Sequence, residues 1–93
     1  MNNYLEILNE NIEAVKTGDY AEELMPLLQW LKHWRPAQDG EAMVEYLTSA
    51  EIQSTMSELM NIDLNLISTT MWRLGYEVSV AATHPAWAMI MTD

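Results

Sequence analysis

The hydrophobic period of this 93-residue chain changes at Gly75, and this change constrains the fold more than any other feature of the sequence. Before Gly75, apolar residues recur at the 3.6-residue spacing of an amphipathic helix, at Leu64, Ile67, Met71 and Leu74. After Gly75, residues 76–81 alternate as in a strand, with Tyr76, Val78 and Val80 on one face. Gly75 itself suits the left-handed residue that ends many helices. The sequence therefore predicts a helix that leads directly into a strand.

A further helix is predicted just before this one. Thr48 and Glu51 have the spacing of a capping box, in which each side chain accepts a hydrogen bond from a backbone N–H at the helix start. The apolar residues that follow at helical spacing are Ile52, Met56, Leu59 and Met60. Residues 61–63 interrupt the period, and either Asn61 or Asp63 can cap the next helix. The turn between the two helices is therefore only a few residues long.

The residues around these helices predict a small antiparallel sheet. Residues 82–86 contain Pro85, which cannot donate to a β-ladder, so this segment suits a hairpin loop. Residues 87–91 can return as the partner strand, and the short apolar run at residues 43–47 can add a third strand. The predicted order of elements is strand, helix, helix, strand, strand.

This order of elements is similar to that of a known superfamily. The segment YLTSAEIQ, followed by ISTTMWRLGYE, resembles the winged helix-turn-helix superfamily, and within it the winged domains of phage and plasmid replication proteins and small regulators. The resemblance covers residues 46–91, about half of the chain. It implies that residues 63–74 form the recognition helix and that residues 82–86 form the wing.

The first 35 residues are predicted to form a helical hairpin. A first stripe, capped by Asn2 or Asn3 and ending near Gly18, consists of Leu5, Leu8, Ile12 and Val15, with Tyr4 and Ile7 beside them. Asp19 and Glu22 repeat the capping-box spacing. The second stripe consists of Tyr20, Leu24, Leu27, Leu28, Leu31 and Trp34. Pro26 lies within this stripe and therefore either kinks the helix or begins a new one in its first turn.

Together these patterns predict a mostly α fold with a small antiparallel β-hairpin wing. We expect the N-terminal helical hairpin, residues 1–35, to pack on a winged helix-turn-helix at residues 43–92. A linker at residues 35–41 contains a proline and an Asp-Gly pair, which favour a turn. The apolar residues, 49% of the chain, suffice for one modest core, so residues 1–93 are expected to form a single domain.

The charge balance argues against direct DNA binding. The chain has 14 acidic and 4 basic side chains, which give a net charge of −10. Residues 1–43 carry 8 acids and 3 bases, and residues 44–93 carry 6 acids and 1 base, so each part contributes −5. Nucleic-acid-binding proteins draw much of their affinity from lysine and arginine side chains that neutralise phosphates. The part that resembles a winged helix offers only Arg73 for this purpose.

Several classes of site and location are disfavoured by the sequence. His33 and His84 lie far apart, neither has a metal-ligand partner at helical spacing, and there is no glycine-rich phosphate loop. The adjacent pair Glu22 and Glu23 is typical of a solvated helix face. We therefore expect a non-enzyme without a metal or cofactor.

The expected location is the cytoplasm. No apolar run reaches the roughly 20 residues that cross a bilayer, the N-terminus is acidic, and cysteine is absent. We therefore expect a cytoplasmic protein with no membrane partner.

The candidate partner-binding residues lie on the side of the predicted recognition helix that is not needed for its apolar stripe: Asn65, Leu66, Thr69, Thr70, Trp72 and Arg73. In a DNA-binding regulator, Asn65 and Arg73 would contact bases, while Thr69 or Thr70 would contact phosphate. In a protein-binding module, Leu66 and Trp72 would be anchors that a partner covers.

The third possibility is that Leu66 and Trp72 pack against the N-terminal hairpin and that this side of the helix is inert. Among the three, we expect a protein partner, with a homodimer as an alternative. A sharper hypothesis is a phage or mobile-element product that inhibits or assists a DNA-handling, nucleic-acid-binding protein. Its carboxylates would occupy a groove meant for phosphates, as in DNA-mimic inhibitors.

Overall fold

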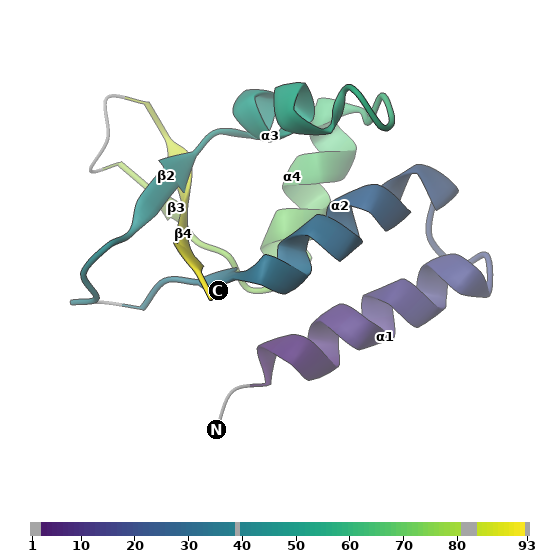
Figure 1. The fold of residues 1–93 in the computed structure, drawn as a ribbon, viewed down its shortest axis with the longest axis horizontal. Helices are drawn as coiled ribbons and strands as arrows, with labels where there is room; N and C mark the ends of the chain where they lie inside the picture. Colours follow the sequence, from purple (N-terminus) through teal and green to yellow (C-terminus); the bar gives the residue numbers. More distant parts are fainter. Residues whose placement is uncertain (1–2, 39, 81–83, 93) are drawn as a thin grey trace.

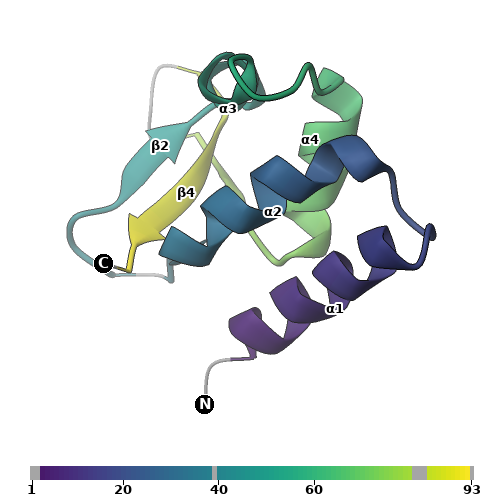
Figure 2. The ribbon, with the colours of Figure 1, turned by 45° about the vertical axis from the view of Figure 1, so that its right-hand side comes forward.

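The computed structural model describes residues 3–38, 40–80 and 84–92, and it combines helices with a small antiparallel sheet. The α-helices are α1 (Tyr4–Lys16), α2 (Met25–Trp30), α3 (Ser49–Met56) and α4 (Leu64–Arg73). Two short 3₁₀ turns, η1 (Glu22–Leu24) and η2 (Leu31–His33), flank α2. The strands are β1 (Trp34–Pro36), β2 (Glu45–Leu47), β3 (Val78–Ser79) and β4 (Ala86–Met91). Figures 1 and 2 show the sheet at one end of the molecule and the helices at the other. The prediction of a mostly α fold with a small antiparallel sheet is confirmed.

The N-terminal helices form the predicted hairpin. α1 ends at Lys16, Thr17 caps it, and Gly18 follows with φ of +88°, a conformation that glycine adopts without strain. Pro26 lies in the first turn of α2, so it begins a new helix rather than kinking a longer one. The predicted capping box of Asp19 and Glu22 is wrong, because Ala21 precedes η1 and no side chain caps it. Asp19 instead accepts a hydrogen bond from the Thr17 hydroxyl at 3.1 Å.

Other details of this hairpin differ from the prediction. Asn3 stands at the start of α1, but its side chain makes no capping hydrogen bond, and Asn2 lies outside the described residues. Leu5 is exposed, whereas Tyr4, Leu8, Ile12 and Val15 are buried. The buried side of α1 is therefore centred on these four residues and faces α2, which lies beside α1 in both views (Figures 1 and 2).

Helices α3 and α4 begin where their caps predict. The Thr48 hydroxyl accepts from the Glu51 N–H at 3.1 Å, and the Glu51 carboxylate accepts from the Thr48 N–H at 2.9 Å, which completes the capping box. Asp63, rather than Asn61, caps α4 by accepting from the Asn65 N–H at 2.9 Å. Gly75 follows α4 with φ of +94°, as the period change predicted. Local capping chemistry therefore fixes both starts and the end of α4.

α3 ends one turn earlier than its apolar period predicted. The Ser57 hydroxyl donates to the Ser54 carbonyl at 2.7 Å, and such side-chain bonds compete with the helical backbone ladder. Leu59 is 68% exposed and Met60 is also exposed. The prediction that these two residues belong to the buried stripe is therefore wrong. Ile62 is buried in their place. Leu64, predicted to be buried in the next stripe, is likewise exposed at the first position of α4.

Strand β4 is the centre of the sheet. β2 pairs antiparallel with one edge of β4, and β1 and β3 both pair antiparallel with β4 as well. β1 and β3 share the other edge end to end, because the Ala88 carbonyl accepts from the Ala37 N–H while the Ala88 N–H donates to the Glu77 carbonyl. β1 corrects the prediction of a helical stripe that runs through Trp34 and of a linker at residues 35–41. Pro36 is tolerated in β1 because this strand lies at an edge of the sheet.

The strand after Gly75 is shorter than predicted. Within residues 76–80, the strand that pairs with β4 comprises Val78–Ser79, and Tyr76 is buried whereas Val78 and Val80 are exposed. Ala81, the last residue of the predicted strand, lies outside the described residues. The return strand is confirmed, since β4 spans Ala86–Met91. Part of the predicted loop, residues 82–83, lies outside the described residues.

One hydrophobic core connects the helices with the sheet. It contains residues of every α-helix and of β1 and β4, among them Leu8, Leu28, Ile52, Met71 and Met89. Tyr76 also lies in this core, directly after α4, and its ring meets that of Tyr4 edge to face with centroids 5.6 Å apart. The N-terminal hairpin therefore packs against one side of α4, and the opposite side of α4 faces outward.

Candidate partner-binding face on helix α4

The outward side of α4 carries Asn65, Thr69 and Trp72, here called the α4 face. These residues are four and three positions apart, so they form one stripe along the helix. All three are exposed, and the Trp72 side chain is 74% exposed. The opposite side of the helix buries Ile67, Met71 and Leu74, which explains why this stripe must face away from the core. Trp72 does not pack against the N-terminal hairpin, so it is not part of the core.

The other predicted partner-binding residues have different positions. Thr70 is 0% exposed, and its hydroxyl donates to the Leu66 carbonyl at 2.8 Å. Thr70 cannot contact phosphate in this arrangement, which corrects that part of the DNA-binding hypothesis. Leu66 is half-buried and packs against the hydrophobic core. The six predicted residues therefore separate into an exposed stripe of three and a second group that packs inward.

Arg73 belongs to this second group. Its Nε donates to the Asn11 side-chain oxygen at 2.7 Å, and its guanidinium carbon lies 4.0 Å from the centroid of the Tyr20 ring. Asn11 is buried and also donates to the Ile7 carbonyl at 2.7 Å, so its orientation is fixed. Arg73 thus joins α4 to α1 and to the turn after it by a charge-assisted hydrogen bond and a cation–π contact. The guanidinium is not presented on the α4 face.

A second polar contact holds the other flank of α4. The hydroxyls of Ser49 and Ser68 lie 2.7 Å apart, and the Trp87 indole N–H donates to the Ser49 hydroxyl at 3.0 Å. These three residues come from α3, α4 and β4, so the contact fixes α4 relative to both neighbours. No sequence pattern predicts this network, because the serines are 19 positions apart and no motif links them to the tryptophan.

Most of the basic side chains contact partners within the chain. Lys16 lies 3.5 Å from the Glu13 carboxylate, and Arg73 is engaged with Asn11. Arg35 donates from both terminal nitrogens to the two carboxylate oxygens of Glu41, one of them at 2.9 Å. This pairing, with a further hydrogen bond from the Gln38 N–H, lowers the pKa of Glu41 to about 2. Three of the four cations in the sequence are therefore occupied by internal contacts.

The described residues contain no candidate metal site. They contain no group of three or more His, Cys, Asp or Glu side chains that could hold a metal ion. Among the helices that they form, none is both long and apolar enough to cross a membrane. Comparisons with known protein families, curated proteins and solved structures find no match to this chain.

Proposed function

We propose that this chain is a small, acidic, non-enzymatic protein that acts by binding another protein through the α4 face. The observation that supports this proposal best is the 74% exposure of Trp72. A tryptophan ring that is left in water keeps most of its apolar area available for burial by a partner. Tryptophan is also enriched among the residues that dominate the energy of protein interfaces. Asn65 and Thr69, in the same stripe, would supply hydrogen bonds beside this anchor.

The net charge of −10 favours a basic partner over a second copy of the chain. Two copies would bring like charges together, whereas a basic surface would be attracted over a distance of about one Debye length. A protein that handles DNA presents such a surface. We therefore propose a phage or mobile-element inhibitor or accessory factor whose carboxylates occupy a phosphate-binding groove.

The arrangement of α3, α4, β2, β3 and β4 supports a winged helix-turn-helix as the scaffold. The two capped helices precede β3 and β4, and β2 pairs with β4 on the edge opposite β3. In such a scaffold α4 is the recognition helix, which is the basis of the alternative function, a DNA-binding transcriptional or replication regulator. The engaged Arg73 and the Asp63 carboxylate at the start of α4 weigh against this alternative.

The proposal is tested by quantitative capture of proteins from the cells that produce this chain. The Trp72→Ala variant is compared with Leu5→Ala, a matched control that shortens an exposed apolar side chain on α1. We expect one basic protein to bind the wild-type chain and the control with equal affinity. Trp72→Ala should weaken its binding by about 2 kcal/mol, or about 30-fold. A partner that binds all three proteins equally would show that the α4 face is not the interface.

A further inference from the structure

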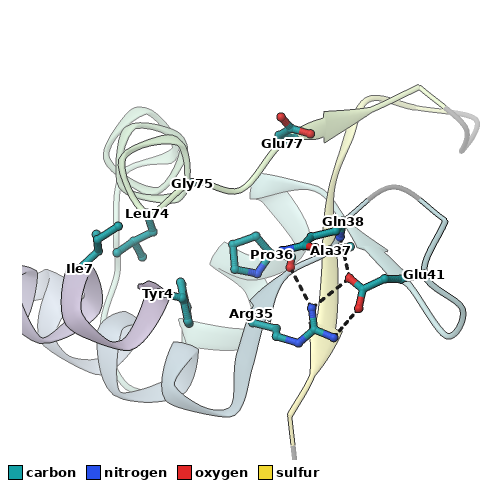
Figure 3. A pocket seen from close by; sticks show the side chains of 10 residues that line it. All are labelled: Tyr4, Ile7, Arg35, Pro36, Ala37, Gln38, Glu41, Leu74, Gly75 and Glu77. Atoms are coloured by element: carbon teal, nitrogen blue, oxygen red, sulfur yellow. Dashed lines mark hydrogen bonds and ion pairs between the residues drawn. The ribbon is translucent and has the colours of Figure 1, made fainter. Parts of the chain in front are cut away.

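Two adjoining hollows lie on a different part of the surface from the α4 face. The larger has a volume of about 700 Å³ and lies where the start of α1, the end of α4 and the segment after β1 meet. Figure 3 shows its lining, with Tyr4 and Leu74 on one side and the Arg35–Glu41 pair on the other. Tyr4 and Leu74 line this hollow but are buried, whereas Ile7, Pro36 and Ala37 are half-buried and leave apolar surface that an aliphatic chain can contact.

The charges around the larger hollow do not balance. Arg35 and Glu41 are bound to each other in a bidentate pair, so their charges cancel locally. Glu77 lies at the edge of the same hollow, apart from this pair in Figure 3, and its side chain is exposed. Within residues 3–38, 40–80 and 84–92, its carboxylate has no hydrogen-bond or ion-pair partner. One uncompensated negative charge therefore remains at this site.

The smaller hollow extends the larger one across the sheet. It has a volume of about 230 Å³ and shares Ala37, Gln38, Glu41 and Glu77 with its neighbour. Its far side includes Tyr46, which pairs with Ala88 across β2 and β4. Glu77 therefore borders both hollows, and the smaller one also includes Tyr46.

We propose that the two hollows together bind a basic side chain, arginine or lysine, of an extended segment from another protein. The aliphatic part of this side chain lies along Ile7, Pro36 and Ala37, and its cation pairs with the Glu77 carboxylate. The exposed ring of Tyr46 adds a cation–π surface for a second basic residue of the same segment. An anionic ligand is disfavoured, because Arg35 is already neutralised and the whole chain carries −10.

The test is an NMR titration of the ¹⁵N-labelled full chain at low salt. The probe is the blocked peptide acetyl-Ala-Arg-Ala-amide, and its citrulline analogue, which has the same shape without the charge, is the ligand control. We expect saturable shift changes at the backbone amides of Ala37, Gln38, Gly75 and Glu77 with the arginine peptide. The citrulline peptide should cause much smaller changes.

Two variants locate the interaction. Glu77→Gln keeps the backbone bond to Ala88 and should weaken binding of the arginine peptide by about three- to fivefold, the upper part of the range for an exposed ion pair. Glu58→Gln removes an exposed carboxylate that lines neither hollow and should leave the affinity unchanged. Equal binding of the citrulline peptide would overturn the proposal. So would the absence of any saturable shift, or shifts spread over the acidic surface and weakened equally by both variants.

Discussion

The hydroxyl groups of Tyr4 and Tyr76 lie 2.6 Å apart in the core, and they join the first helix to the segment after α4. The Tyr4 hydroxyl donates its single proton to the Leu31 carbonyl at 2.9 Å, so the proton between the two tyrosines comes from Tyr76. This chain of hydrogen bonds fixes the N-terminal hairpin behind α4.

The direction of these bonds predicts unequal effects of removing the two hydroxyls. Tyr76→Phe removes one bond and leaves Tyr4 bound to Leu31, so it should lower the free energy of unfolding by about 1 kcal/mol. Tyr4→Phe leaves both the Leu31 carbonyl and the Tyr76 hydroxyl without this partner, so it should cost about 2 kcal/mol. Urea unfolding followed by circular dichroism measures both values. A larger loss for Tyr76→Phe would contradict the assigned direction.

The same pair predicts a loss of stability in alkaline solution. Burial raises the pKa of Tyr4 to about 12, although the hydrogen bond from Tyr76 partly opposes this, and burial also raises the pKa of Tyr76. Because the folded protein favours the neutral phenols, their contribution is complete below pH 10, the ordinary pKa, and is lost as the pH rises towards about 12. Urea midpoints should therefore fall over this range. In the double variant Tyr4→Phe, Tyr76→Phe the fall should be shallower, and an equal fall in both proteins would refute the assignment.

Arg73 is predicted to contribute to folding. Arg73→Ala removes the hydrogen bond to the buried Asn11 side chain and the contact with the Tyr20 ring, so it should lower the free energy of unfolding by about 2 kcal/mol. Lys32→Ala, which removes an exposed cation on η2, is the control and should change stability by less than about 0.5 kcal/mol. If thermal unfolding shows no difference between the two variants, Arg73 is free to act elsewhere.

We expect this protein to bind duplex DNA only weakly. At about 0.15 M salt, fluorescence anisotropy with random duplex DNA should detect no more than very weak binding, because three of the four cations are engaged internally. Measured DNA-binding proteins typically make about 6–10 phosphate contacts. Sub-micromolar binding with a steep salt dependence would restore the DNA-binding regulator as the better hypothesis.

The features that the sequence predicted well depend on neighbouring residues. The Thr48–Glu51 capping box, the Asp63 cap and the left-handed Gly75 each involve side chains and backbone groups within a few positions. The start of α2, with Pro26 in its first turn, belongs to the same class, because proline has no N–H and its φ is fixed. Such local signals remain readable without knowledge of the rest of the fold.

The features that the sequence missed depend on distant residues. β1 is three residues long and contains Pro36, so its assignment to the sheet required knowing that β4 lies beside it. Arg73 looked like a partner-binding residue because Asn11, its hydrogen-bond acceptor, is 62 positions away. Leu59 and Leu64 follow the helical period, but Leu59 lies in the turn after α3 and Leu64 is the first residue of α4, and both are exposed. Periodicity alone cannot indicate where an element stops packing.

The central claim is that Trp72 is kept at the surface for a partner, and the stability of Trp72→Ala tests it most directly. Because the ring is 74% exposed, its removal should change the free energy of unfolding by less than about 0.5 kcal/mol in urea unfolding. Ile67→Ala, on the fully buried side of the same helix, should cost about 2–5 kcal/mol and shows that the measurement detects core losses. A loss of about 3–5 kcal/mol for Trp72→Ala would place the ring in the core and contradict the proposed α4 face.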